Sequence, residues 1–339
     1  MILILTAICG EISAQQDVVQ GASDLSKYIL TPKAAPTPRI NGARIFGVRP
    51  GSEFLFTIAA TGIRPMIFSA EGLPRGLKLN PATGRITGRV KKTGEYTVRL
   101  SAENALGRYE RDLRIVVGDE IALTPPMGWN SWNCWARDVT QEQILSSARA
   151  MVEKGLADHG WSYINIDDGW QGRRGGRYNA IQPNKKFPDM AALTREIHDM
   201  GLRVGIYSTP WIGTYAAHIG SYSDRPDGEN EWIEKGLHNE NYRYQKPGGN
   251  YWEDRCEVWH HGPYSFVEAD VKQWAEWGID YLKYDWHPLN YYHVREMFDM
   301  LRKSSSASRT VHPTATLRSG NVMRTAGARQ ATSAIHGKA

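Results

Sequence analysis

The hydrophobic pattern of this chain changes its period near residue 118, and that change limits the possible folds more than any other feature. Between about residues 44 and 117, apolar residues alternate with polar ones, as at Phe54, Phe56 and Ile58. Turn signals containing glycine separate these short runs, and no helix-period stretch interrupts them. Short alternating runs with such turns predict an antiparallel β-sandwich over residues 44–118.

The predicted sandwich offers no group of catalytic residue types. Its stretch from Gly72 to Gly88 resembles the Ig-like modules that are attached to secreted bacterial enzymes. A Pro-rich stretch, residues 31–43, precedes it and is typical of a stiff linker. We therefore interpret residues 44–118 as a spacer or docking module.

After residue 120, candidate strands alternate with candidate helices, which predicts a parallel sheet covered by helices. The candidate strands are residues 127–132, 162–167, 202–208 and 279–285. Two closures fit this order, an open doubly wound sheet and a (β/α)₈ barrel. No Gly-x-Gly-x-x-Gly motif follows a candidate strand, which disfavours a dinucleotide-binding fold.

Polar residues mark three of the expected helix starts. Thr140, Asp189 and Asp270 each precede residues with the apolar spacing of a helix. We therefore interpret Asp189 and Asp270 as helix caps rather than as catalytic residues.

Residues 303–339 differ abruptly from everything before them. They contain six Lys or Arg residues and no Asp, Glu, Trp, Tyr or Phe. Because the whole chain has 41 basic and 36 acidic residues, residues 1–302 carry a net charge of −1. The basic character therefore belongs to this segment rather than to a folded face, and we expect no nucleic-acid partner.

The same segment bears on the fold. Four strand–helix units precede it, whereas a (β/α)₈ barrel needs eight. We expect a barrel truncated after about four units within residues 121–302, followed by a disordered or frame-shifted tail at 303–339. The alternative, a complete small domain with a natural tail, would leave the edges of a parallel sheet open.

Residues 1–14 hold a short apolar run followed by small and polar residues. This pattern fits a signal peptide, and so a secreted or periplasmic protein, with a buried N-terminal strand as the alternative. The run is too short to span a membrane, and we expect no membrane partner. The three cysteines are too few for a disulfide scaffold, and spacing leaves open whether Cys134 and Cys256 pair.

Polar residues gather at the carboxyl ends of the candidate strands, where strand–helix folds place their sites. Asn165 and Asp167 share one strand face, as do Lys283 and Asp285, because side chains alternate along a strand. Carboxylates accept hydrogen bonds from sugar hydroxyls, and aromatic rings stack on the apolar face of a sugar. Asp285 beside Lys283 would stay ionised, as the nucleophile of a retaining glycosidase must be.

The connection over residues 209–269 is long and contains 11 aromatic residues. It would form a wall of a binding cleft, or alternatively a packing or partner surface.

The histidines give little support for a metal site. His260, His261 and His287 lack the spacing of metal ligands on a helix. We expect no metal and no cofactor.

Four motifs follow one another in this region: PPMGWNSW at residues 125–132, IDDGW at 166–170, GIY at 205–207 and WGIDYLKYD at 277–285. In this order they resemble glycoside hydrolase family 27, the retaining α-galactosidases and α-N-acetylgalactosaminidases. The resemblance implies a (β/α)₈ catalytic barrel followed by a β-rich C-terminal domain. It also implies an α-galactoside oligosaccharide or polysaccharide as the substrate.

Residue roles follow from the resemblance by position. Asp285 resembles the nucleophile that forms a covalent galactosyl–enzyme. Asp167 and Asp168 resemble the pair that binds the axial 4-hydroxyl and the 6-hydroxyl. Lys283 resembles the lysine that contacts the 3- and 4-hydroxyls. Trp132 and Tyr207 resemble the tryptophan against the sugar and the tyrosine beside the nucleophile.

The chain also departs from the family. The acid/base aspartate of the family lies well past the nucleophile, and no matching stretch is present here. Gly169 stands where many eukaryotic members have a cysteine, and Trp129 fits the core as well as the site. We expect an α-galactosidase-type hydrolase of terminal α-linked galactose, with this chain inactive. The alternatives are a non-catalytic carbohydrate-binding protein and an α-N-acetylgalactosaminidase.

Overall fold

The computed structural model describes residues 33–216, 218–229, 261–285, 291–304 and 312–314. The predicted signal peptide, residues 1–14, lies outside the described residues. The chain divides at residue 35, and almost all of the described structure belongs to the unit that begins at Pro36.

The N-terminal part of this unit is a β-sandwich, as predicted. A four-stranded sheet in the order β2-β9-β8-β5 shares one core with a three-stranded sheet in the order β3-β7-β6. Only β2 and β9 pair in parallel within these two sheets. The strands are β1 (Arg39–Ile40), β2 (Ile45–Val48), β3 (Glu53–Thr57), β4 (Ala60–Thr61), β5 (Ile67–Glu71), β6 (Leu77–Leu79), β7 (Arg85–Arg89), β8 (Gly94–Asn104) and β9 (Gly107–Val117).

The sandwich begins earlier than predicted. Strand β1 lies within the predicted linker, residues 31–43, and pairs with β4 through Ile40 and Ala60. Ile40 is buried, so its apolar side chain draws this part of the linker into the core.

The predicted alternation fails at Leu55, which lies between the core residues Phe54 and Phe56 and is buried as well. Its side of the strand is covered by the strand–helix region. The Arg203 guanidinium donates to the Leu55 carbonyl from Nη2 at 2.6 Å and from Nε at 3.1 Å. Thr57 Oγ1 donates to the Gly201 carbonyl at 2.8 Å. Burial against another part of the chain therefore replaces solvent on this side.

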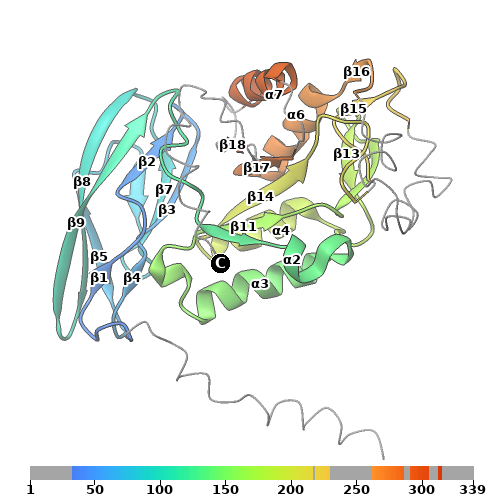
Figure 1. The fold of residues 1–339 in the computed structure, drawn as a ribbon. Coiled ribbons are helices and arrows are strands. Elements are labelled where there is room, and N and C mark those ends of the chain that lie inside the picture. Colours follow the sequence, from blue (N-terminus) through green and yellow to red (C-terminus); the bar gives the residue numbers. More distant parts are fainter. Residues whose placement is uncertain (1–32, 217, 230–260, 286–290, 305–311, 315–339) are drawn as a thin grey trace, which may run out of the picture. The chain divides into compact units, whose positions relative to one another are not determined.

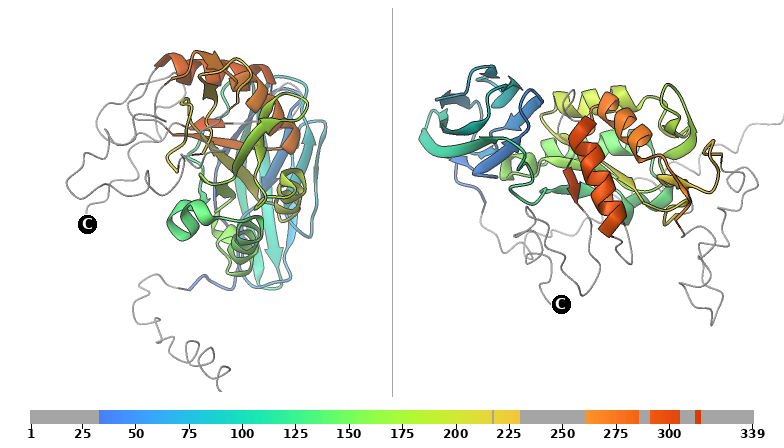
Figure 2. Two further views of the ribbon diagram at one scale, coloured as in Figure 1. Left: turned by 90° about the vertical axis from the view of Figure 1, so that its right-hand side faces the viewer. Right: turned by 90° about the horizontal axis from the view of Figure 1, so that it is seen from above.

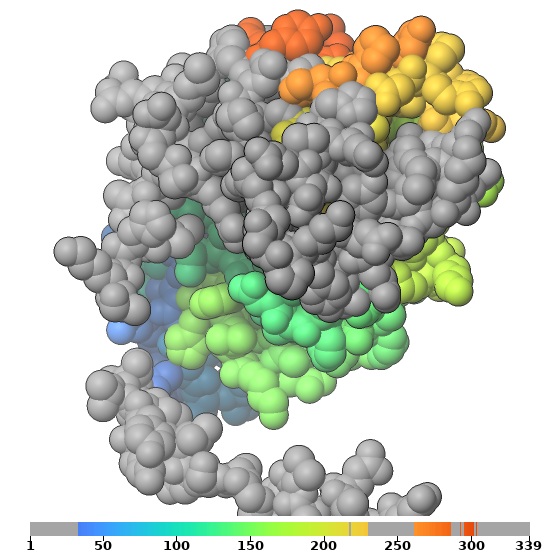
Figure 3. Space-filling view, turned by 45° about the vertical axis from the view of Figure 1, so that its right-hand side comes forward, coloured from blue at the N-terminus to red at the C-terminus, as the bar shows by residue number. Residues whose placement is uncertain are grey.

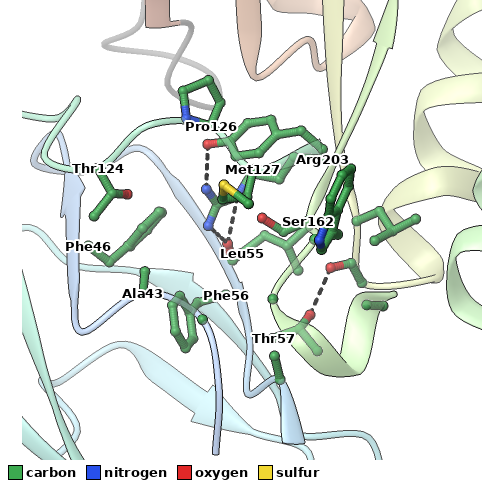
Figure 4. A pocket seen from close by; sticks show the side chains of 18 of the residues that line it. Ala43, Phe46, Leu55, Phe56, Thr57, Thr124, Pro126, Met127, Ser162 and Arg203 are labelled. Atoms are coloured by element: carbon green, nitrogen blue, oxygen red, sulfur yellow. Dashed lines mark hydrogen bonds between the residues drawn. The ribbon is translucent and has the colours of Figure 1, made fainter. Parts of the chain in front are cut away.

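A cavity of about 380 Å³ remains where the sandwich meets the strand–helix region. Phe46 and Leu55 line it from the sandwich, and Met127 and Arg203 line it from the other side (Figure 4). Its lining is mostly apolar, and the Arg203 guanidinium already bonds to Leu55 and to the Tyr163 hydroxyl. None of the predicted site residues lines this cavity.

The strand–helix region contains a parallel sheet in the order β10-β11-β14-β17-β18 (Figure 1). Its first four strands confirm the four predicted ones. The strands are β10 (Gly128–Asn130), β11 (Tyr163–Ile166), β14 (Arg203–Ser208), β17 (Tyr281–Tyr284) and β18 (His312–Thr314).

Strand β18 corrects one expectation, because it lies within the predicted tail at 303–339. It pairs with β17 through His312 opposite Tyr281 and Thr314 opposite Lys283. The sequence gives no apolar run here, but pairing satisfies backbone groups that β17 would otherwise leave open. The segment therefore adds a fifth strand to the four predicted.

One short helix, α2, and four longer helices accompany the sheet, and α6 and α7 lie side by side (Figure 2). Helices α6 and α7 also reach the surface in the orange to red part of Figure 3. The helices are α2 (Trp132–Trp135), α3 (Gln141–Glu153), α4 (Met190–Asp199), α6 (Val267–Trp277) and α7 (Tyr291–Ser304). Short hairpins complete the region: β12 (Gln171–Gly175) with β13 (Ala180–Pro183), and β15 (Tyr222–Ser223) with β16 (Tyr264–Ser265).

Two of the three predicted helix caps are confirmed. Thr140 Oγ1 accepts the Gln143 N–H in a capping box, and Asp189 Oδ1 accepts the Ala192 N–H. Asp270 is not a cap, because α6 begins at Val267, one turn earlier. Its carboxylate is instead fully buried against Arg174.

The two faces of the parallel sheet differ in chemistry. Ile164, Ile206 and Leu282 are fully buried in one core with the helices, and Trp129 packs against that core. Asp167 and Lys283 belong to the other face, because side chains alternate along each strand. This alternation positions the polar residues together on the face that lacks the helices. Among the described residues, no helix is long and apolar enough to cross a membrane.

Candidate active site

The lysine of β17 and the first aspartate after β11 form an ion pair. Lys283 Nζ lies 2.8 Å from Asp167 Oδ2, and the Asp167 side chain is only 2% exposed. Asp167 is fixed further, because its N–H donates to the buried Ser131 Oγ at 3.0 Å. The sequence places Lys283 beside Asp285, but its ammonium pairs with Asp167 instead. The positive charge that the sequence suggests for Asp285 is therefore paired with Asp167.

Tyr207, from β14, connects this ion pair to Asp285. Its hydroxyl donates to Asp285 Oδ2 at 3.3 Å, a long hydrogen bond. The Lys283 ammonium lies 5.1 Å from the centre of the Tyr207 ring, within cation–π range. Burial raises the pKa of Tyr207 well above its usual range, and the nearby Asp285 raises it further. Tyr207 therefore remains a neutral hydrogen-bond donor toward Asp285.

Asp168 is fully buried, and each of its carboxylate oxygens has a donor. Thr214 Oγ1 donates to Oδ1 at 2.8 Å, and the Ala216 N–H donates to Oδ2 at 2.6 Å. Burial raises the pKa of Asp168 to about 7, although these two hydrogen bonds act in the opposite direction. Around neutral pH this carboxyl therefore changes between its charged and neutral forms.

Trp132 joins the same group through an aromatic contact. Its ring meets that of Tyr215 edge-on, with centroids 6.0 Å apart and an interplanar angle of 89°. Tyr215 lies between the two residues that hold Asp168. All six predicted site residues are thus connected by contacts of side chains or by segment 214–216.

The turn after the two aspartates is held from behind. The Trp170 indole N–H donates to the Tyr207 carbonyl at 2.9 Å. Asn184 Nδ2 donates to the Gly169 carbonyl at 2.8 Å and to the Gln171 carbonyl at 3.2 Å. These bonds tie the end of β11 to β14 and fix the direction of both carboxylates.

Only part of the aromatic-rich connection, residues 209–269, falls within the described residues. Tyr215 faces Trp132 at the site, whereas His261 bonds the Pro210 carbonyl through Nδ1 at 3.1 Å. His260, His287 and Cys256 lie outside the described residues, and Cys134 is an exposed free thiol. Within the described ranges, no three His, Cys, Asp or Glu side chains gather to hold a metal ion.

Two partners of Asp168, Thr214 and Ala216, are not predicted from the sequence. They lie within the connection singled out for its aromatic residues, but Thr and Ala there form no recognisable motif. The backbone N–H of Ala216 could not be predicted from any side chain. What the sequence does reveal is the carboxylate that they hold.

Two family models match the sequence of this chain. Residues 124–236 match the model described as "Alpha galactosidase A", and residues 37–118 match a model of a proposed Ig domain. The resemblance to the α-galactosidases is confirmed. The α-galactosidase match includes Trp132, Asp167, Asp168 and Tyr207 and ends before Lys283 and Asp285.

Curated α-galactosidases are similar to the chain over a part of their length. "Probable alpha-galactosidase" of Dictyostelium discoideum is 30% identical over 56% of this chain and 36% of its own length. "Alpha-galactosidase A" of Cellvibrio japonicus is 35% identical over 50% of this chain and 31% of its own length. The chain thus spans about a third of these relatives.

A solved structure agrees with this likeness. The crystal structure of a proposed α-galactosidase from Bacteroides fragilis is 36% identical, with a TM-score of 0.65. The match covers 84% of this chain and 53% of that protein. Because it covers so much of the chain, the likeness extends over both the sandwich and the strand–helix region.

Proposed function

We propose that this chain carries the sugar-binding residues and the nucleophile of a retaining α-galactosidase-type glycoside hydrolase. One observation supports this most directly: Asp285, Tyr207, Lys283, Asp167 and Asp168 form one connected group at the carboxyl ends of parallel strands. A site with several carboxylate acceptors, one ammonium and an aromatic wall suits the hydroxyls and the apolar face of a sugar. The names of the relatives point to terminal α-linked galactose as that sugar.

The reaction follows from the roles of these residues. A carboxylate oxygen of Asp285 attacks the anomeric carbon, and the bond to the leaving oxygen breaks, which gives a covalent galactosyl–enzyme and a leaving-group anion that takes its proton from solvent. Water then attacks the same carbon, loses a proton to solvent, and releases galactose and the Asp285 carboxylate. Tyr207 holds Oδ2 of Asp285, which leaves Oδ1 free to attack. Asp167 and Asp168 accept hydrogen bonds from the sugar hydroxyls.

We also propose that the parallel sheet belongs to a (β/α)₈ barrel. Its strands alternate polar and apolar residues, with the helices on the apolar side, as barrel strands do. The five described strands then form one arc of the barrel, with the site at their carboxyl ends.

A retaining glycosidase also uses a second carboxyl group as its general acid. After Asp285 the sequence contains only two carboxylate side chains, Glu296 and Asp299, both on α7. Glu296 accepts hydrogen bonds from Tyr222 and Ser265, and Asp299 pairs with Arg295. Within the described part of the chain, these contacts engage both carboxylates away from Asp285 and Tyr207. We therefore propose that these 339 residues are essentially inactive on unactivated α-galactosides, because the leaving group is not protonated.

Comparing leaving groups tests the proposal. We expect α-galactosyl fluoride, which needs little acid assistance, to be hydrolysed with retention of configuration. Unactivated α-galactosides should react roughly 10²–10⁴-fold more slowly than in an enzyme with an acid. Asp285→Asn should abolish fluoride release, and Asp299→Asn is the matched control that should not.

The outcomes separate the possible functions. Galactose binding without any fluoride release would favour a non-catalytic carbohydrate-binding protein. Fast turnover of an unactivated α-galactoside would contradict the proposal that no general acid protonates the leaving group. If the chain neither bound galactose nor released fluoride, the proposed function as a whole would be contradicted.

A further inference from the structure

The segment Thr214–Tyr215–Ala216, here called the clamp segment, contacts three of the proposed site residues. Thr214 and Ala216 each give one donor to Asp168, one to each carboxylate oxygen. The backbone of Tyr215 lies close enough to the Tyr207 hydroxyl to act against the rise of its pKa, and the Tyr215 ring packs edge-on against Trp132. Three consecutive residues therefore connect parts of the site that come from three different segments of the chain.

The clamp segment is itself held in a tight turn. The Thr214 N–H donates to the His218 carbonyl at 2.7 Å, and Gly213 bridges to Ile219. Thr209 Oγ1 donates to the Gly213 carbonyl at 3.0 Å, and Thr214 is fully buried. The turn therefore fixes the position of Thr214 without help from a ligand.

The hydroxyl of Thr214 has a defined direction. The His218 N–H donates to Thr214 Oγ1 at 2.9 Å, which occupies an acceptor site of the hydroxyl. The hydroxyl hydrogen is then free to point at Asp168 Oδ1, 2.8 Å away. A hydroxyl oriented in this way favours the charged form of the carboxylate over the neutral one.

We propose that Thr214, supported by the clamp segment, is a positioning residue that presents ionised Asp168 to the sugar. This inference rests on the proposed function. A carboxylate has about four acceptor sites, and the clamp segment takes one on each oxygen. The remaining acceptor capacity can receive a sugar hydroxyl, and it is greatest when the carboxyl carries no proton.

Two substitutions of Thr214 separate its hydroxyl from its shape. Thr214→Val keeps the volume and removes the donor, whereas Thr214→Ser keeps the donor. We expect the Kd for galactose, measured by calorimetry at pH 7, to rise about tenfold or more in Thr214→Val, because the hydrogen bond goes to a charged group. Thr214→Ser should stay within about twofold of the unmodified chain.

The pH dependence distinguishes positioning from a merely structural role. Without the Thr214 donor, Asp168 should take up a proton more readily, so galactose binding should weaken at a higher pH in Thr214→Val than in the unmodified chain. A packing defect alone would lower the affinity equally at all pH values. An unchanged Kd and an unchanged pH midpoint in Thr214→Val would overturn the inference while the proposed function stands.

A measurement without sugar keeps the inference testable if galactose does not bind. The titration of Asp168 can be followed by ¹³C NMR of carboxyl-labelled aspartate, with Asp168→Asn to assign the signal. We expect its midpoint to be higher in Thr214→Val than in Thr214→Ser. Equal midpoints would overturn the inference, whereas a failure of the unmodified chain to bind galactose would count against the proposed function alone.

Discussion

The Lys283 ammonium lies 2.8 Å from Asp167 Oδ2, on the strand face that also carries Asp285 two residues further on. Two carboxylates, those of Asp167 and Asp285, therefore share this face of the sheet with one ammonium. Because the Asp167 side chain is nearly inaccessible to solvent, the Lys283 ammonium takes the place of water as the partner of its carboxylate.

Replacing Lys283 should remove sugar binding and weaken the fold. Lys283→Met keeps the length of the side chain but leaves Asp167 buried without its cation. Breaking one partner of a buried ion pair costs about 3–5 kcal/mol of unfolding free energy. Urea unfolding and galactose calorimetry measure the two effects. Lys272→Met, on an exposed i,i+4 pair with Glu268, is the control, and an equal loss in both variants would contradict this account.

Asp168 should make the stability of the fold depend on pH. Its pKa rises from an ordinary 3.8 to about 7, so between these values the folded chain holds a proton that the unfolded chain releases. The unfolding free energy should therefore fall as pH rises from about 4 to about 7. Asp280, buried beside His198, has a pKa raised to about 7 and contributes in the same direction.

Asp168→Asn isolates the contribution of this one carboxyl. In the substituted side chain, the amide nitrogen can donate to Thr214 Oγ1 and the amide oxygen can accept from the Ala216 N–H. Both contacts are therefore kept when the amide group is oriented in this way. We expect a shallower pH slope, higher stability at pH 8 and no galactose binding, all measured against the unmodified chain. A slope identical to that of the unmodified chain would show that Asp168 does not titrate in this range.

The strands and the polar residues on them could be predicted because each strand repeats every two residues. Ile164 and Ile166 surround Asn165 in sequence, and this alternation alone places Asn165 and Asp167 opposite the core. Thr140 was predictable as a cap because its partner Gln143 lies three residues away.

Contacts between distant residues were not predictable. Asp270 looks like a helix cap because it precedes Val271 and Trp274, and its real partner, Arg174, lies 96 residues earlier. The role of Thr214 is hidden in the same way, since 46 residues separate it from Asp168. Sequence patterns report the local neighbours of a residue, whereas both of these roles come from the fold.

The ion pair between Arg174 and Asp270 should be essential for stability. Its two hydrogen bonds measure 2.7 and 3.1 Å, and Asp270 Oδ1 also accepts the Ile181 N–H. Arg174 donates to the Gly220 carbonyl as well, so the pair joins β12, β13, α6 and the connection before β15. Asp270→Asn should therefore lower the unfolding free energy by about 3–5 kcal/mol.

A matched exposed pair provides the control for this prediction. Glu276 lies on α6, as Asp270 does, and pairs with Arg177; both of these side chains are exposed. Glu276→Gln removes this pair and should lower the unfolding free energy by at most about 1 kcal/mol. Both values come from urea unfolding. A loss for Asp270→Asn as small as that for Glu276→Gln would contradict the importance of burial.

The contact between the sandwich and the strand–helix region should make the two unfold together. Arg203 donates twice to the Leu55 carbonyl and once to Tyr163, and its guanidinium lies 4.2 Å from the centre of the Phe46 ring. Residues 37–118 contain no tryptophan, so tryptophan fluorescence reports only the strand–helix region. A change in the core of the sandwich should nevertheless shift that signal if the two parts are coupled.

Leu113→Ala provides this change, because Leu113 is fully buried in the core of the sandwich. Removing a buried leucine side chain costs about 2–5 kcal/mol, and coupled unfolding would carry that cost into the fluorescence transition. Adding Arg203→Met should weaken the coupling, so that Leu113→Ala moves the tryptophan midpoint less, although Thr57 still bonds the Gly201 carbonyl. A tryptophan transition that ignores Leu113→Ala while Arg203 is intact would mean that the hydrogen bonds to Leu55 do not join the two parts into one cooperative unit.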